Sequence, residues 1–349
     1  MALIEFTERG FYCAAGGFYI DPWRPVEYAI ITHAHSDHAR WGHKHYLCHH
    51  LTKPLLELRL GPQSYQAIGW NEPFTRNGVT ISLHPAGHDE PAGDPGCGRS
   101  SQVRIEYQGE VWVVSGDYKT ENDSLSGLFE PVRCHTFITE CTFGLPVYQW
   151  KPQEQLYQSL RQWVSHNHAQ GYGSVLFAYS LGKAQRVTQA VAGNGIPVFV
   201  HGSVWNTHQQ LQAAGVSLPE VNRVTPETNR QALQQAIVIT PASAADTPWL
   251  RRFSPIKTAV CSGWMQLRGA ARRQHTDAGF ALSDHADWNG LLSAVKATGA
   301  ERVYATHGFQ SAFSRFLTEQ GIEAAEVTTE FGGEEGAAEM AEPMNDTGL

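Results

Sequence analysis

Seven residues whose side chains can bind metal ions or take part in catalysis come soon after short apolar runs. This regularity constrains the fold more than any other feature of the sequence. They are His33, His88, Asp117, Glu140, Ser180, His285 and His307. The runs before them, such as residues 28–31, are rich in apolar and β-branched residues and are typical of buried strands. In layered α/β folds, residues just past the strand ends gather along one rim and form the site. The sequence therefore predicts an α/β protein whose site is collected from distant segments.

Helices and strands alternate in the second part of the chain. Helices are predicted over residues 155–166, 183–191 and 208–214, and strands over residues 174–178, 196–200, 236–240 and 258–261. This alternation predicts βαβ units around a mostly parallel sheet. Before residue 152, strands dominate, with a hairpin predicted across residues 103–115 and one short helix over residues 54–60. Four further histidines are interpreted as a mixed polar surface: His43, His45, His49 and His50.

The segment Thr32-His33-Ala34-His35-Ser36-Asp37-His38 is the strongest chemical signal in the chain. Two histidines one residue apart can turn to the same side of an extended loop, and the following Asp-His pair then faces a second position nearby. Imidazole and carboxylate ligands suit Zn and similar divalent ions. Two such ions about 3.5–4 Å apart form a hydrolytic clamp. The spacing therefore predicts a metal site.

Composition narrows the class of protein. With 349 residues and 42% hydrophobic content, the chain can bury a large core, equivalent to two or three domains. No apolar run approaches the roughly 18–20 residues of a membrane span, the first residues do not resemble a signal peptide, and the six cysteines are dispersed without a CxxC pair. These features predict a cytoplasmic protein with reduced thiols. The net charge of -8 argues against nonspecific coating of nucleic acid. It says little about a cleft, where bound cations and arginines can reverse the potential.

Several motifs resemble those of the metallo-β-lactamase superfamily. Residues 33–38, 85–88 and 115–117 resemble its signature, third and fourth motifs, and Glu140, His285 and His307 resemble motifs A, B and C of its β-CASP nuclease branch. Within that branch, residues 18–25, 115–119, 262–265 and 282–288 are most similar to bacterial ligase-associated DNA exonucleases. The resemblance implies a four-layer αββα metallo-β-lactamase fold with an inserted α/β β-CASP domain.

The resemblance also implies domain boundaries. Residues 1–146 and 280–331 would form the metallo-β-lactamase domain and residues 147–279 the β-CASP domain, with the active site in the cleft between them. Residues 332–349 are predicted to be an acidic, disordered tail. One departure from the family pattern follows His88, where residues 89–98 form an insertion. Its acidic residues would either shape the rim of the metal site or hinder the approach of DNA.

The metal ligands implied by the resemblance serve two divalent ions, Zn first and Mn as the alternative. His33, His35 and His88 would hold one ion, Asp37, His38 and His307 the other, and Asp117 would bridge them. The implied catalytic residues are Asp37, Asp117, Glu140 and His285. The ions would activate a hydroxide that attacks phosphorus. Glu140 would orient His285, which would contact the scissile phosphate and protonate the leaving oxygen.

A second set of residues is predicted to bind the nucleic-acid strand: Ser180, Lys183, Ser262, Gly263, Trp264, Arg268, Arg272 and Arg273. Backbone amides after Ser180, together with Lys183, could bind a phosphate at the start of a helix. The arginines beside Trp264 could combine phosphate pairing with base stacking. The competing interpretations are ordinary helix capping by Ser180 and a solvated charged face for the arginines.

The resemblance implies that the protein is a metal-dependent DNA exonuclease in DNA repair, acting on single-stranded or end-containing DNA together with a DNA ligase and a helicase. The products would carry a 5′-phosphate and a 3′-hydroxyl. An RNA-processing β-CASP ribonuclease is the main alternative, because His307 is a feature of the RNA-directed members. A small-molecule hydrolase and a non-catalytic nucleic-acid-binding protein are two further alternatives. Polarity, strandedness and the physiological metal stay open.

Overall fold

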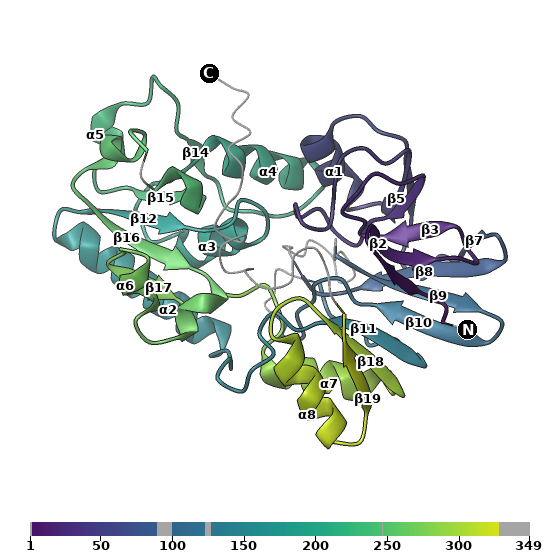
Figure 1. The fold of residues 1–349 in the computed structure, drawn as a ribbon. Coiled ribbons are helices and arrows are strands. Elements are labelled where there is room, and N and C mark those ends of the chain that lie inside the picture. Colours follow the sequence, from purple (N-terminus) through teal and green to yellow (C-terminus); the bar gives the residue numbers. More distant parts are fainter. Residues whose placement is uncertain (1, 89–99, 123–126, 246, 328–349) are drawn as a thin grey trace. The chain divides into compact units, whose positions relative to one another are not determined.

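The computed structural model describes residues 2–88, 100–122, 127–245 and 247–327. The insertion predicted at residues 89–98 and the tail predicted at residues 332–349 lie outside the described residues. The chain divides into two compact units (Figure 1). The first unit contains the described residues up to Pro146 and those from His285 onward, and the second contains Val147–Asp284. The chain thus returns to the first unit at His285, whereas the resemblance placed the return at residue 280.

The first unit contains two mixed sheets. One has the order β1-β2-β3-β4-β5-β6, made of Glu5–Thr7, Gly10–Cys13, Phe18–Ile20, Tyr28–Ile30, His45–His49 and Tyr65–Ile68. The other has the order β19-β18-β11-β10-β9-β8-β7, made of Glu323–Glu326, Arg302–Thr306, Thr136–Glu140, Glu110–Val114, Ser101–Tyr107, Val79–Pro85 and Phe74–Arg76. Strands β3 to β6 run parallel, as do β10, β11, β18 and β19.

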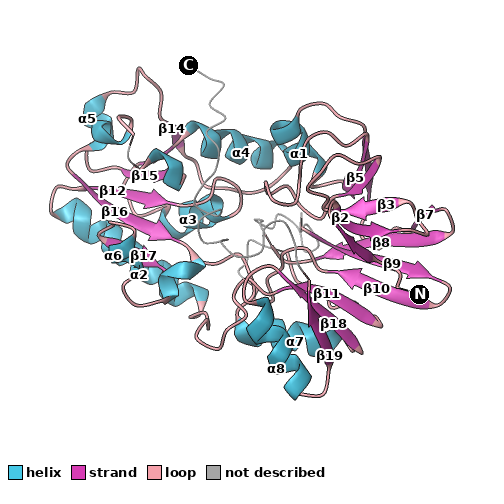
Figure 2. Cartoon of the chain, in the orientation of Figure 1, coloured by secondary structure: helices cyan, strands magenta, loops and turns pink. Residues whose placement is uncertain are grey.

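The two sheets of the first unit pack face to face and are covered by helices on their outer faces. Ile30 and Leu47 of the first sheet share one core with Ile81 of the second. Helix α1 (Lys53–Leu60) covers the outer face of the six-stranded sheet, where the Tyr65 hydroxyl donates to the Leu56 carbonyl. Helices α7 (Trp288–Thr298) and α8 (Gln310–Glu319) pack on the seven-stranded sheet through a second core (Figure 2). The first unit is therefore a helix–sheet–sheet–helix structure.

The second unit is built on one fully parallel sheet. Its order is β14-β13-β15-β12-β16-β17, made of Asn222–Arg223, Val198–Val200, Ile237–Thr240, Gly173–Phe177, Ile256–Cys261 and Ala278–Phe280. One face packs against helices α2 (Gln153–Ala169), α3 (Lys183–Val191) and α4 (Gly202–Ala213). The other packs against α5 (Arg230–Leu233) and the 3₁₀ turn η2 (Leu250–Phe253). Three short turns complete the unit: η1 (Ala242–Ala244), η3 (Gly263–Gln266) and α6 (Ala270–Arg273). The predicted α/β class, with helices alternating around a parallel sheet, is confirmed.

Two local predictions are wrong. Helix α4 begins at Gly202 instead of position 208, because the side chain of His201 accepts a hydrogen bond from the Ser203 amide and caps the helix there. The polar surface predicted for the four histidines is wrong for His43 and His49, whereas His45 is half-buried at the start of β5 and His50 is exposed. His43 and His49 are each 4% exposed, and the ring of His49 stacks on Trp70 at 3.6 Å.

Candidate metal centre

The strand ends of both sheets bring the predicted ligands together in the first unit. In the seven-stranded sheet, β8, β10, β11 and β18 point in the same direction, so the residues after them lie along one edge. His88, Asp117 and His307 follow three of these strands, and Glu140 is the last residue of the fourth. The segment containing His33 follows β4 of the other sheet. Because the sheets pack against each other, one rim collects all of them.

Asp117 lies at the centre of the cluster. Its Oδ2 lies 3.4 Å from Nε2 of His33 and 3.7 Å from Nε2 of His88, and its Oδ1 lies 3.3 Å from Nε2 of His38. Three groups of the described residues have ligand atoms within 4.8 Å of one another: His33, His35, His88 and Asp117; Asp37, His38 and Asp117; and Asp117, Glu140 and His285. All three groups share the carboxylate of Asp117, so this residue alone can connect neighbouring ligand sets.

The geometry of the cluster fits divalent ions. Nε2 of His33 and Nε2 of His38 are buried and form no hydrogen bond with any described residue. A tetrahedral ion with bonds of about 2.0–2.1 Å holds its ligand atoms about 3.3 Å apart. The 3.4 and 3.3 Å separations from Asp117 match this spacing. These groups could therefore bind metal ions, and imidazole with carboxylate is a donor set suited to Zn.

The charges of the cluster are strongly coupled. Burial lowers the pKa of His33 to about 3, assisted by the positive charge of His38. For His38 burial acts in the same direction, but the carboxylates of Asp117 and Asp37 outweigh it and raise the pKa well above its usual value. Burial would raise the pKa of Asp117, yet His38 and His285 hold it well below the usual range. Asp117 is therefore an anion at neutral pH, and the His33 imidazole is neutral, as metal ligands must be.

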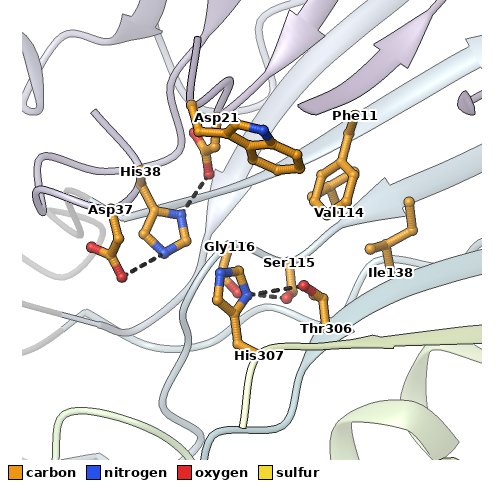
Figure 3. A pocket seen from close by; sticks show the side chains of 11 residues that line it. Phe11, Asp21, Asp37, His38, Val114, Ser115, Gly116, Ile138, Thr306 and His307 are labelled. Carbon is orange, nitrogen blue, oxygen red and sulfur yellow. Dashed lines mark hydrogen bonds and ion pairs between the residues drawn. The ribbon is translucent and has the colours of Figure 1, made fainter. Parts of the chain in front are cut away.

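His307 comes close to the cluster without joining any of the three groups that contain Asp117. Its ring centroid lies 5.4 Å from that of His38, and both line a small cavity of about 20 Å³ with Asp37, Ser115 and Gly116 (Figure 3). A cavity of this size accommodates about one water-sized group. Burial and the charge of His38 lower the pKa of His307. Its role as a ligand of the second ion stays a prediction.

Asp21 is part of the site and was not predicted from the sequence. Its Oδ2 lies 2.8 Å from Nδ1 of His38 (Figure 3). The same oxygen accepts a 2.5 Å hydrogen bond from the Thr32 hydroxyl, and Oδ1 accepts from the Thr32 amide at 2.8 Å. A carboxylate behind a ligating imidazole fixes the ring orientation and raises its basicity. Asp21 follows strand β3 directly, so the strand-end rule that selected the other residues would also have found it.

Replacing Asp21 by asparagine should weaken the site without removing a predicted ligand. The amide keeps the shape but puts an NH₂ group where the carboxylate accepts from Thr32 and His38. We expect metal affinity to fall about 10–100-fold, as is usual for such supporting residues. Competition with a chromogenic chelator measures it. Asp277→Asn, which alters a carboxylate bound to Lys257 and Thr258 in the second unit, is the matched control and should leave metal affinity unchanged.

Gly116 allows β10 to approach the His33 segment. It has a φ of +57°, and a Cβ at this position would lie 2.8 Å from the Cβ of Thr32. Gly116→Ala should therefore combine about 1–2 kcal/mol of left-handed strain with about 1–3 kcal/mol of overpacking. Gly109 is a matched control, because it has a φ of +84° but no atom within 4 Å of its Cβ position. Thermal unfolding should show the larger fall in midpoint for Gly116→Ala; equal falls would contradict the steric argument.

Glu140 and His285 form a buried pair beside the ligands. Nδ1 of His285 lies 2.9 and 3.1 Å from the two oxygens of Glu140. The same carboxylate accepts from the Tyr118 amide at 2.8 Å and the Thr142 hydroxyl at 2.6 Å. With its oxygens engaged in this way, Glu140 is better suited to orient His285 than to hold an ion. The ring of His285 lies 4.8 Å from that of His88 (centroid to centroid), so the pair borders the metal ligands.

The predicted strand-binding residues lie in the second unit. Ser180 does not cap α3, whose N-cap is Gly182, and its hydroxyl lies 2.8 Å from that of Ser203. Lys183 is buried, and its Nζ lies 3.9 Å from Asp284, which also pairs with Arg186. Ser262 caps η3, which contains Gly263 and Trp264. The arginines are exposed: Arg268, Arg272 and Arg273. Their binding of nucleic acid stays a prediction.

The chain is similar to a curated protein and to proteins of known structure. No family model matches the chain. A protein of Opitutus terrae described as a probable DNA ligase is 30% identical over 326 residues, which is 92% of this chain and 30% of that protein. A crystal structure of a protein of unknown function from Enterococcus faecalis V583 matches 88% of this chain and 80% of its own, with a TM-score of 0.57 and 12% identity. The second similarity shows a shared fold. The chain spans 30% of the length of its curated relative, so that protein's activity is not assigned to it.

Two further predictions from the sequence concern the cysteines and membrane-spanning helices. The five described cysteines form no disulfide with one another, and four of them are buried. Within the described part of the chain, no helix is long and apolar enough to cross a lipid bilayer.

Proposed function

We propose that the protein is a metal-dependent DNA exonuclease of the metallo-β-lactamase superfamily, β-CASP branch, that processes DNA ends for ligation. The observation that carries the proposal is the position of Asp117. It is shared by the group of His33, His35 and His88 and by the group of Asp37 and His38, and the Glu140–His285 pair borders these ligands. The similarity of the whole chain to part of a protein described as a probable DNA ligase supports DNA as the substrate.

The proposed ligands follow the groups around Asp117. His33, His35 and His88 would hold one divalent ion and Asp37, His38 and His307 the other, and Asp117 would serve both. When bound, the ions lower the pKa of water and neutralise charge on the phosphodiester. Zn suits this donor set, and Mn is the alternative.

The remaining chemistry belongs to side chains of this protein. Glu140 fixes the orientation of His285 by accepting from its Nδ1. The opposite nitrogen, Nε2, contacts the scissile phosphate and gives a proton to the leaving oxygen, so the new strand end carries a hydroxyl. Asp21 and Thr32 hold His38, and the loop after β4 that contains it, in place during turnover.

End-labelled substrates test the proposal. Single-stranded DNA, blunt duplex DNA and RNA of one sequence, each labelled at the 5′ or the 3′ end, are digested with Zn or Mn. Progressive release of nucleotides from DNA, abolished by a chelator and restored by the metal, is the expected result. Digestion of RNA alone would assign the protein to the RNA-processing alternative, and failure to cleave any of the three would overturn the proposal.

A further inference from the structure

Trp41 is exposed to an unusual degree for so large an apolar side chain. It is 71% exposed, the highest value among the large hydrophobic residues of the described chain. All ten tryptophans lie within the described residues, and the other nine are buried or half-buried. A tryptophan held in water contributes little to the core, so packing does not explain this side chain.

The segment that carries Trp41 is firmly anchored on both sides. The Tyr46 hydroxyl donates to the Arg40 carbonyl at 3.0 Å and accepts from the His43 amide at 3.1 Å. The ring of His43 in turn accepts from the Val26 amide at 3.3 Å. Tyr46 and His43 are only 1% and 4% exposed. The backbone on both sides of Trp41 is therefore held in place, so little conformational entropy of this segment is lost when a flat partner covers the ring.

The position of Trp41 relative to the metal ligands is fixed by the chain itself. It follows His38 by three residues, so their Cα atoms are at most about 11 Å apart. A stacked nucleic-acid strand advances about 3.4 Å per nucleotide. The backbone at Trp41 thus lies within the length of about three stacked nucleotides of the backbone at His38, a predicted ligand. Both residues belong to the first unit, so the upper limit on their distance does not depend on the second unit.

We propose that Trp41 is a stacking platform for an unpaired base of the substrate, and that the protein therefore acts on single-stranded nucleic acid near the cut. This rests on the proposed function and extends it to the form of the substrate. An exposed aromatic ring accepts the face of any base, so it selects unpaired bases without selecting sequence. Paired bases inside a duplex offer only their edges. Trp41 is a positioning residue, since it holds the strand and takes no part in the chemistry.

Substitutions at one position separate stacking from simple apolar contact. Trp41→Phe keeps an aromatic face, whereas Trp41→Leu keeps an apolar side chain without one, and Trp41→Ala removes both. We expect KM for single-stranded DNA to rise about 5- to 150-fold in Trp41→Leu and Trp41→Ala, with a much smaller change in Trp41→Phe. The kcat at saturation should change little. Equal KM values for Trp41→Leu and the wild type would overturn the proposal.

An abasic substrate provides the reciprocal test. Removal of one base within three nucleotides of the cut should raise KM for the wild type and leave KM for Trp41→Ala unaltered, because the two changes remove the same contact. Additive effects would refute stacking at this residue.

Binding measured without cleavage separates this proposal from the proposed function. Fluorescence anisotropy of a labelled single strand is followed with wild-type protein and Trp41→Ala. Weaker binding in Trp41→Ala, in a protein that cleaves nothing, would keep the stacking platform and reject the nuclease. Normal cleavage with unchanged binding in Trp41→Ala would reject the platform and keep the nuclease.

Discussion

Asp117→Ala is expected to abolish activity and to lose bound metal from both ligand groups. Asp117 lies within 3.7 Å of three histidine nitrogens and is the residue that both groups share. Metal ions contribute several kcal/mol to hydrolysis of this kind, and each 1.36 kcal/mol is tenfold in rate, so the loss should be on the order of a thousandfold or more. Metal analysis of the purified protein and the end-label assay measure the two effects.

Asp37→Ala is the matched control for Asp117→Ala. Asp37 belongs to one ligand group only. Its replacement should lower the occupancy of one ion and leave the group of His33, His35 and His88 intact. If Asp37→Ala and Asp117→Ala lost metal to the same extent, Asp117 would not connect two sites.

His285→Ala is expected to retain its metals and to lose most of its turnover. Its Nδ1 is held by Glu140, and His285 belongs neither to the group of His33, His35 and His88 nor to the group of Asp37 and His38. Loss of a general acid costs about 10²–10⁴-fold in rate, and the fall should appear in kcat. His50→Ala, which removes an exposed histidine on the same unit, is the control and should behave as the wild type.

Glu140→Gln tests whether Glu140 works through His285. The glutamine side chain can still accept a hydrogen bond from the Tyr118 backbone amide, but it lacks the negative charge that faces the His285 imidazole. It should lower kcat in the wild type and have little further effect in His285→Ala. A wild-type rate in His285→Ala would contradict the role of His285 as general acid.

The residues of the site were accessible from the sequence because they obey a simple local rule. His33, His88, Asp117 and His307 come soon after apolar runs, and runs of that kind can be seen without any tertiary information. Parallel strands then bring their carboxyl ends together. The same rule points to Asp21, which is directly after β3, but a lone carboxylate gives no sign of which imidazole it holds.

Other features depended on contacts that the sequence does not show. The strand His45–His49 contains two histidines and resembles a polar segment, yet stacking on Trp70 and packing beneath α1 make it buried. The ion pair of Lys183 with Asp284 joins residues about a hundred positions apart. Tertiary packing determines both the burial of this strand and the ion pair. Where packing and local sequence pattern disagree, packing determines the structure.

The interruption of the first unit has a consequence for synthesis. Strand β18 lies between β19 and β11, and His307 follows it, so the seven-stranded sheet is incomplete until the whole second unit has been translated. A nascent chain still on the ribosome at residue 284 already contains His33, His88 and Asp117, but neither His285 nor His307. The cluster around Asp117 therefore gains its last two histidines only after the whole second unit has been made.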